Sequence, residues 1–172
     1  QGTTATGTGT VTATVSGGGD TCVFNPSATR MVPPDGIWEP LQKFLLPHGL
    51  FDFELVGCEP GSEVTISTTW PNLKGITGYM KYGQTSFSNG KAIWYPPKNL
   101  HVSGNTVTYT IRDGELGDDD LTVNGVIRDP GGPVIDNGVN AIPTLSQWAL
   151  MLLGGLLGLM ALRRRDLLSS PR

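Results

Sequence analysis

The sequence predicts an all-β fold, a small antiparallel β-sandwich, followed by a single C-terminal transmembrane helix. Short runs of alternating or β-branched residues recur between residues 21 and 135, with turn-forming dipeptides between them. No amphipathic helical pattern longer than a turn or two precedes residue 145. An uncharged apolar run then covers residues 145–162, which is long enough for one transmembrane helix.

The strands are predicted in chain order from period-two alternation. Residues 51–55 alternate apolar and acidic side chains, and residues 63–69 and 106–112 are alternating and rich in β-branched side chains. Turn sequences such as Pro60-Gly61 and Asn89-Gly90 separate such runs. The predicted strands cover residues 10–15, 51–55, 63–69, 79–82, 92–95 and 106–112. The predicted core aromatic residues are Trp38, Phe44, Phe51, Phe53, Trp70 and Trp94.

Composition divides the chain into four segments. Residues 1–20 are rich in Thr and Gly, and we interpret them as a linker or the last strand of a preceding module, with Gly17–Gly19 as a flexible joint. Residues 21–135 form the predicted sandwich module, residues 136–141 a short spacer, and residues 142–172 a sorting tail.

Overall composition argues against several classes of function. The net charge of −3 does not suit a general nucleic-acid binder, so no nucleic-acid partner is expected. Two His residues, His48 and His101, are expected at the surface, and there is no G-x-S-x-G motif. Asp52 and Glu54 share one strand face, but acids there usually form the wet face of a strand rather than a glycosidase pair. We therefore expect no enzyme.

Cys22 and Cys58 are the two cysteines of the chain. In an exported protein an even pair predicts a disulfide bond, which would stabilise the fold by roughly 3–4 kcal/mol through loop entropy. A reactive thiol pair is the alternative, but the two residues lack a C-x-x-C spacing.

A cluster of carboxylates follows the predicted strand of residues 106–112. Hard oxygen ligands on a Gly-rich loop suit Ca²⁺, which is the candidate cofactor and would rigidify the loop. The spacing is not that of an EF-hand, and the alternative is a solvated acidic turn built from turn-forming Asp and Gly. The candidate calcium ligands are Asp113, Glu115, Asp118, Asp119, Asp120 and Asp129.

The apolar run of residues 145–162 would rise about 27 Å as a helix, close to the ~30 Å hydrocarbon core of a bilayer. Arg163, Arg164 and Arg165 follow at once and would act as a stop-transfer signal on the cytoplasmic side, leaving the body outside the inner membrane. Gly154 and Gly158 have the spacing of a helix-packing motif, although glycines are also common in membrane helices.

Residues 142–165, IPTLSQWALMLLGGLLGLMALRRR, resemble the IPTL-CTERM sorting signal of Gram-negative bacteria. The resemblance rests on the order of motif, transmembrane helix and Arg-rich tail. It implies recognition, and cleavage of the tail, by an exosortase, a membrane protease and transpeptidase. The motif residues are Ile142, Pro143, Thr144, Leu145 and Trp148.

A second resemblance covers about Cys22 to Pro133. The segments YMKYG at residues 79–83 and GDDDLTVNGVIRDPGG at residues 117–132 are similar to the choice-of-anchor U domain. That family consists of extracellular modules placed just before a C-terminal anchor. The resemblance implies a surface protein and no chemical activity.

Together these patterns predict a non-enzymatic protein that is exported to the cell surface or secreted. Before processing, its C-terminal helix would lie in the inner membrane with the tail in the cytoplasm. Its expected partners are an exosortase-type enzyme and the inner membrane. One alternative is a self-assembling filament subunit that keeps its apolar helix and forms a homo-oligomer. The other is a calcium-dependent adhesin or carbohydrate-binding module.

Overall fold

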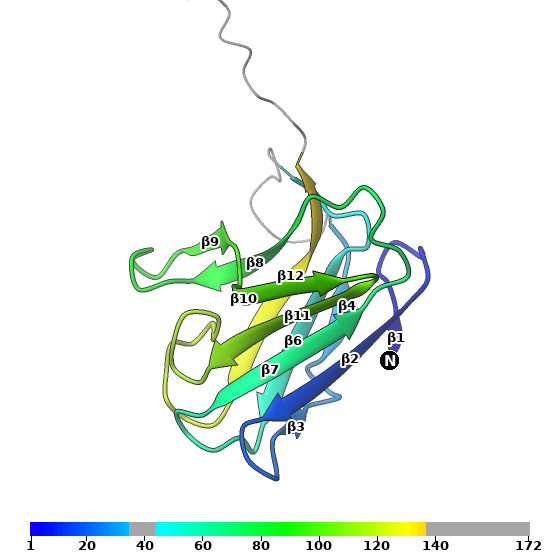
Figure 1. Cartoon of the computed structure of the whole chain (residues 1–172). Helices are drawn as coiled ribbons and strands as arrows, with labels where there is room; N and C mark the ends of the chain where they lie inside the picture. The colour runs from blue at the N-terminus through cyan, green and yellow to red at the C-terminus, as the bar shows by residue number, and fades with distance from the viewer. Residues whose placement is uncertain (35–43, 137–172) are drawn as a thin grey trace, which may run out of the picture. The chain divides into compact units, whose positions relative to one another are not determined.

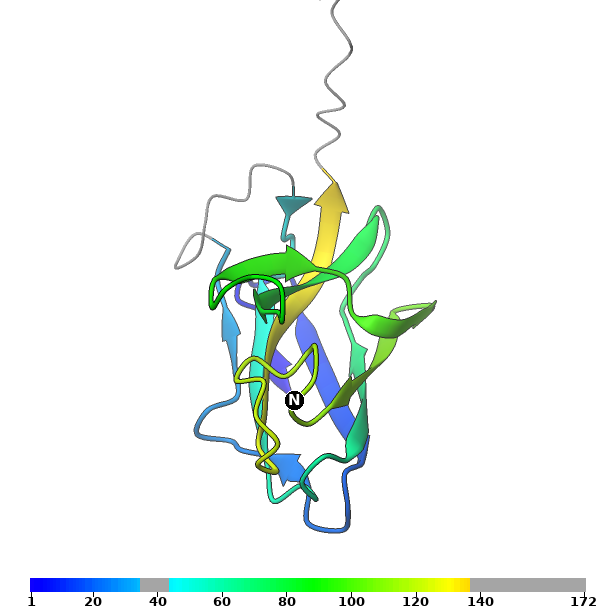
Figure 2. The ribbon, with the colours of Figure 1, turned by 90° about the vertical axis from the view of Figure 1, so that its left-hand side faces the viewer.

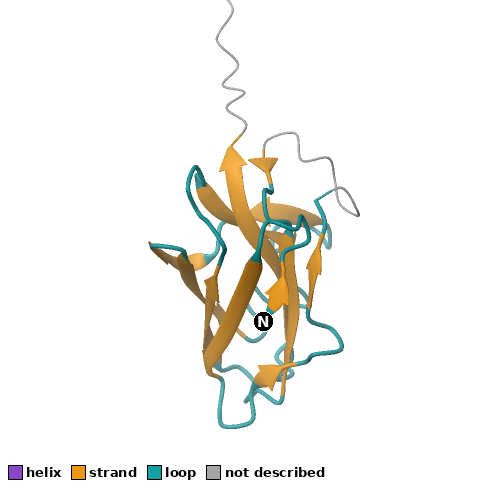
Figure 3. Cartoon of the chain, turned by 90° about the vertical axis from the view of Figure 1, so that its right-hand side faces the viewer, coloured by secondary structure: helices purple, strands orange, loops and turns teal. Residues whose placement is uncertain are grey.

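Two antiparallel sheets face each other in the described part of the chain (Figure 1). The computed structural model describes residues 1–34 and 44–136, which belong to one compact unit, Gln1–Asn137. These residues form strands, turns and loops and no helix (Figure 3), so the all-β prediction with antiparallel sheets is confirmed. Within these two ranges no helix is long and apolar enough to cross a membrane. The predicted helix of residues 145–162 lies outside the described residues.

Each sheet joins strands that are distant in sequence. The first sheet has the order β1 (Gly2–Thr3), β2 (Thr10–Gly17), β7 (Glu63–Thr69), β11 (Thr106–Arg112) and β10 (Lys98–Ser103). The second sheet follows the path β3 (Val23–Phe24), β6 (Leu50–Val56), β12 (Ile127–Asp136), β8 (Gly78–Gln84) and β9 (Ala92–Tyr95). Off this path, β4 (Arg30–Val32) pairs with β6, and β5 (Phe44–Leu45) pairs with β12.

The core lies between the sheets because alternation and register place apolar side chains on one face. Ile66 of β7 lies opposite Tyr109 of β11, and Val64 lies opposite Ile111. All four are at most 1% exposed. Burying each such side chain contributes about 1.5–3 kcal/mol. The strand prediction for residues 63–69 and 106–112 is confirmed with the same bounds.

The predicted core aromatic residues divide between two clusters. Phe51, Phe53 and Trp70 lie in the main core between the sheets. Phe44 and Trp94 are partly buried and pack on a smaller cluster of Val32, Leu46, Leu50 and Val134. Trp38 lies outside the described residues.

Residues 1–20 are neither a linker nor part of another module, which corrects the sequence interpretation. β2 pairs with β7 over residues 12–17 and is a full member of the first sheet. Gly18 lies in a tight turn with a φ of +78°, and a Cβ there would come within 2.7 Å of the Cys22 Sγ. The Glu59 N–H donates to the Gly18 carbonyl at 2.8 Å. The glycine run is therefore packed against the disulfide rather than free to flex.

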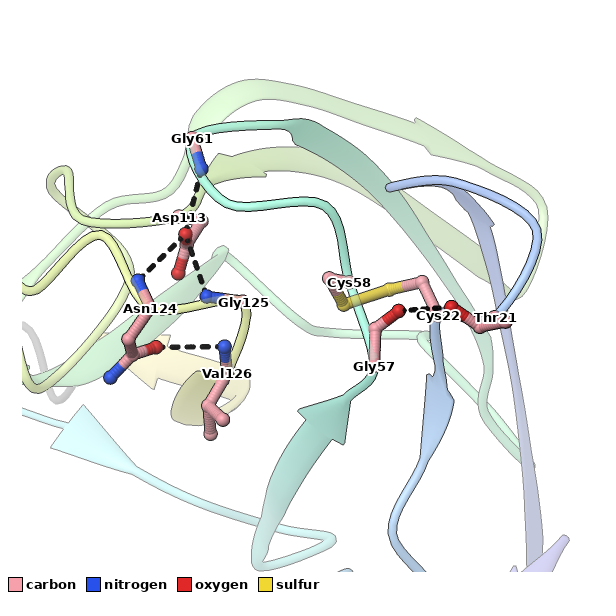
Figure 4. The surroundings of a disulfide bond; sticks show 9 residues. All are labelled: Thr21, Cys22, Gly57, Cys58, Gly61, Asp113, Asn124, Gly125 and Val126. Atoms are coloured by element: carbon pink, nitrogen blue, oxygen red, sulfur yellow. Dashed lines mark hydrogen bonds between the residues drawn. A yellow bond between two sulfur atoms is a disulfide. The ribbon is translucent and has the colours of Figure 1, made fainter.

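The predicted disulfide is present between Cys22 and Cys58. It joins the start of β3 to the end of β6, which also pair with each other (Figure 4). The Thr21 hydroxyl donates to the Gly57 carbonyl at 2.6 Å beside it. The disulfide therefore holds the short edge strand β3 against β6 at this end of the second sheet.

β12 was not predicted as a strand, because its sequence IRDPGGPVID is dominated by Pro and Gly, which normally mark turns. In the structure it is the central strand of the second sheet. It pairs with β6 over residues 127–131 and with β8 over residues 131–134. A Cβ at Gly131 would come within 2.9 Å of the Tyr79 ring, and one at Gly132 within 2.6 Å of the Gly49 carbonyl oxygen. The two glycines are needed for close approach. β12 also includes Asp136, so the predicted spacer of residues 136–141 begins one residue too early.

We expect Gly132→Ala to destabilise the module by about 1–3 kcal/mol, because the new methyl group meets a backbone oxygen that cannot move alone. Chemical denaturation followed by tryptophan fluorescence measures the change. Gly78→Ala in the neighbouring strand β8 is the matched control, since its Cβ would lie 3.7 Å from Val134, an ordinary contact. Equal loss of stability in both variants would contradict the role assigned to Gly132.

Candidate functional site

The acidic loop of residues 113–126 connects β11 of the first sheet to β12 of the second and is yellow-green in Figure 2. Asp113, at the end of β11, is 1% exposed. Its Oδ2 accepts the backbone N–H groups of Gly61 at 2.8 Å, Asn124 at 3.1 Å and Gly125 at 3.0 Å (Figure 4). One carboxylate thus binds both ends of the loop to the turn before β7.

Asp118 and Asp119 tie the middle of the loop to the second sheet. Asp118 is fully buried, and its two oxygens accept the N–H groups of Gly114 at 2.8 Å and Arg128 at 3.1 Å. Asp119 Oδ1 accepts the N–H of Gln84 at 2.7 Å, at the end of β8. Burial raises the pKa of Asp118 to about 6, with further increases from nearby carboxylates, although its two backbone hydrogen bonds oppose the shift.

Asp120 and Glu115 form hydrogen bonds and an ion pair at the surface of the loop. Asp120 accepts the N–H of Thr122 at 2.8 Å and the side-chain amide of Asn124 at 3.0 Å. Glu115 forms an ion pair with Lys98 at 3.0 Å, and this hydrogen bond lowers the pKa of the Glu115 carboxyl.

The candidate calcium ligands are not brought together around one point. Among residues 1–34 and 44–136, no group of three or more His, Cys, Asp or Glu side chains is placed to hold a metal ion. The carboxylates instead accept hydrogen bonds from the protein, so the geometry gives the calcium hypothesis no support. Asp129 lies apart from the loop, on β12, and has a different partner.

Asp129 forms a buried ion pair with Lys81 of β8. Lys81 Nζ lies 3.0 Å from Asp129 Oδ2, and both side chains are 1% exposed. Lys81 also donates to the Gly117 carbonyl at 3.1 Å, and the Tyr109 hydroxyl donates to Asp129 Oδ2 at 3.2 Å. Burial lowers the pKa of Lys81 and raises the pKa of Asp129.

Lys81 is not among the site residues predicted from the sequence, although the alternation of buried residues in β8 indicates that its side chain is buried. Tyr79, Lys81 and Gly83 occupy the buried face of that strand. A lysine at an inward position of a period-two strand requires a buried acceptor, because an unpaired charge there is very costly. Asp129 is the acidic residue that meets this requirement.

The prediction that His48 lies at the surface is wrong, because its side chain is only 5% exposed. Its Nε2 donates to the Asn72 carbonyl at 2.5 Å, and its Nδ1 lies 2.7 Å from the Thr8 hydroxyl. The ring is stacked on Trp70. His48 is therefore a core residue that links residues 1–10 to the body, whereas His101 is exposed as expected.

Asp52 and Glu54 each have a basic partner rather than facing a substrate cleft as a pair. Asp52 lies 3.0 Å from Arg30, and Glu54 lies 2.6 Å from Arg128. The hydrogen bonds from Asn25 and Arg128 lower the pKa of Glu54. Burial raises the pKa of Asp52, although Arg30 opposes the shift. Because each carboxylate is paired with an arginine, this geometry does not favour the glycosidase alternative.

We expect Asp113→Asn to destabilise the module by about 1–3 kcal/mol. Three backbone N–H groups donate to the carboxylate, and the amide replaces one of its two acceptor oxygens with an NH₂ group and removes the charge. Glu115→Gln makes the same chemical change at an exposed carboxylate of the same loop and should leave the denaturation midpoint nearly unchanged. Urea denaturation of the two variants beside the wild type measures the difference. The assignment of Asp113 as the loop's anchor fails if the two substitutions have the same effect.

Asp118 should make stability depend on pH. Its carboxyl has a pKa of about 6 when folded and 3.8 ordinarily, so between these pH values the folded state binds more protons than the unfolded state. The contribution of Asp118 to the free energy of unfolding therefore falls as the pH rises through this range, by on the order of 1–3 kcal/mol.

The check is the difference in unfolding free energy between the wild type and Asp118→Asn, measured from pH 4 to pH 7. This difference should shift against the wild type as the pH rises and level off above about pH 6. A difference that is constant with pH would show that burial does not raise this pKa.

The sorting residues Ile142, Pro143, Thr144, Leu145 and Trp148 lie outside the described residues, as do Arg163–Arg165, Gly154 and Gly158. Sequence comparison reaches this part of the chain. Residues 140–165 match the family of the IPTL-CTERM motif. This motif is a C-terminal sorting signal, which fits an exported protein that an exosortase-type enzyme processes.

No curated protein and no solved structure matches the chain. The match of residues 140–165 does not extend to the module, so the similarity of residues 22–133 to the choice-of-anchor U domain stays a prediction. The C-terminal sorting signal is what the comparisons establish for this chain.

Proposed function

We propose that this is a non-enzymatic bacterial surface protein whose C-terminal tail is recognised and cleaved by an exosortase-type enzyme. The observation that carries the proposal is the match of residues 140–165 to the IPTL-CTERM motif. In this proposal the tail is a substrate, and residues 1–136 are the module that is delivered to the surface.

The proposed tail has three parts with separate physical tasks. Pro143 disfavours helix at the residue before it, which keeps the motif extended and accessible to a protease. The uncharged run of residues 145–162 is long enough to hold the substrate in a bilayer. Arg163–Arg165 would stop transfer and remain on the cytoplasmic side.

The module supports this proposal through its chemistry. The Cys22–Cys58 disulfide is typical of proteins that fold in an oxidising compartment outside the cytoplasm. Asp113 and Asp118 are used to hold the loop, and His48 is buried in the core. A structural surface module that resembles the choice-of-anchor U domain, directly before a sorting tail, accounts for these features together.

The filament and adhesin alternatives have less support. The residues proposed for helix packing in a filament, Gly154 and Gly158, lie outside the described residues. The carboxylates proposed for a calcium-dependent adhesin accept hydrogen bonds from the chain itself. No observation on the described residues favours either function.

The proposal predicts that the protein recovered from the cell surface of an exosortase-containing host lacks its C-terminus from near residues 142–145 onward. Pro143→Ala should leave a larger fraction of full-length protein in the membrane, because the motif is no longer held extended. Intact mass spectrometry of surface and membrane fractions measures both.

Val139→Ala in the preceding segment is the matched control and should be processed like the wild type. A host that lacks the exosortase should retain the full-length chain. The proposal is wrong if wild-type protein at the surface still ends at Arg172.

A further inference from the structure

The buried pair of Lys81 and Asp129 has an arrangement that the sorting function does not explain. Lys81 lies opposite Gly131 in the β8–β12 ladder, so Asp129 is its diagonal neighbour on the same face of the second sheet. Both side chains point into the core and are 1% exposed. The amine nitrogen and the carboxyl group are therefore held in contact by two hydrogen-bonded strands.

Neighbouring elements close the site from the other sides. Tyr109 reaches from β11 of the first sheet, donates to Asp129 Oδ2 at 3.2 Å and places its ring 5.2 Å from Lys81 Nζ. Gly117 of the acidic loop approaches so closely that a Cβ there would lie 2.7 Å from Lys81 Nζ. The pair is thus fixed in a site from which bulk water is excluded.

The second oxygen of Asp129 is the unusual atom in this site. Oδ1 is buried and has no hydrogen-bond partner among the described residues. A buried carboxylate normally has both oxygens satisfied, because an unsatisfied buried acceptor is costly. Loss of this oxygen from the site would remove the unsatisfied acceptor.

We propose that Lys81 Nζ and Asp129 Cγ condense to form an intramolecular amide, an isopeptide bond that links β8 covalently to β12. The neutral amine attacks Cγ with its lone pair, and the C=O π electrons move onto Oδ2, which the Tyr109 hydroxyl stabilises. The intermediate then collapses, and Oδ1 leaves as water. That water takes the proton of the carboxylic acid and one proton of the amine, so one amine proton stays on the new amide. No oxidant, reductant or other reactant is needed.

The environment favours the reactive forms of both groups. Burial lowers the pKa of Lys81 and raises that of Asp129, so the neutral amine and the neutral acid are more populated than in water. Exclusion of water also opposes the reverse reaction, because hydrolysis needs the molecule that the reaction expels. The bond would replace two buried ionisable groups with one neutral amide.

The test is the intact mass of the folded full-length chain after denaturation and reduction of the disulfide. We expect a mass one water molecule below that of the sequence, and a tryptic fragment in which the peptide of Lys81 is joined to that of Asp129. Lys81→Met and Asp129→Ala should each have the full mass of their own sequences. Tyr109→Phe should show a smaller linked fraction at early times after folding.

Controls separate this bond from other losses of small molecules. Succinimide formation at Asp35-Gly36 or Asp113-Gly114 also releases one water, but it leaves the peptides of Lys81 and Asp129 unlinked, and its deficit would persist in Lys81→Met. Lys91→Met, at an exposed lysine, should keep the deficit of the wild type. Cyclisation of Gln1 releases ammonia rather than water and has a different mass. A wild-type chain of full mass, or a deficit that persists in Lys81→Met, would overturn the proposal. Neither result depends on processing of the tail.

Discussion

The contact between Lys81 and Asp129 constrains every element around it. Desolvation of two opposite charges costs several kcal/mol for each ion, and only good geometry with further hydrogen bonds offsets that cost. Those hydrogen bonds come from Tyr109 in the first sheet and from Gly117 in the acidic loop. The separation of the two sheets and the position of the loop are therefore fixed by the same buried pair. A shift of the first sheet or of the loop would remove one of these hydrogen bonds from the buried pair.

The carboxylates of the acidic loop satisfy backbone donors. Its chain crosses from one sheet to the other and leaves N–H groups that no strand ladder satisfies. Asp113 accepts two of them, from Asn124 and Gly125, and also the N–H of Gly61 before β7. Asp118 accepts that of Gly114 and also the N–H of Arg128 on β12. A carboxylate suits this task because it has about four lone-pair sites and no donor.

The strands that could be predicted are those whose pattern is set by one buried face. β7 and β11 alternate cleanly, because one side of each strand faces the core and the other faces solvent. β12 could not be predicted in this way. Its residues 129–134 are all buried, and close packing there requires Gly131 and Gly132, which read locally as a turn. The acidic cluster was visible in sequence, but hydrogen bonds to the backbone and a metal site demand the same residue types. Only the fold decides which partners the carboxylates have.

The position of β12 also determines how the module meets any anchor made through its tail. β12 is the last strand of the described residues and continues in sequence toward the sorting motif of residues 140–165. Tension on that segment reaches the module along β12, which has β6 on one side and β8 on the other. The β8 ladder covers residues 131–134 and the β6 ladder covers residues 127–131, so a load along β12 would meet the two ladders one after the other, with Gly131 in common. Lys81 and Asp129 meet where the partner of β12 changes from β6 to β8, so their contact reinforces the place where this load passes between strands.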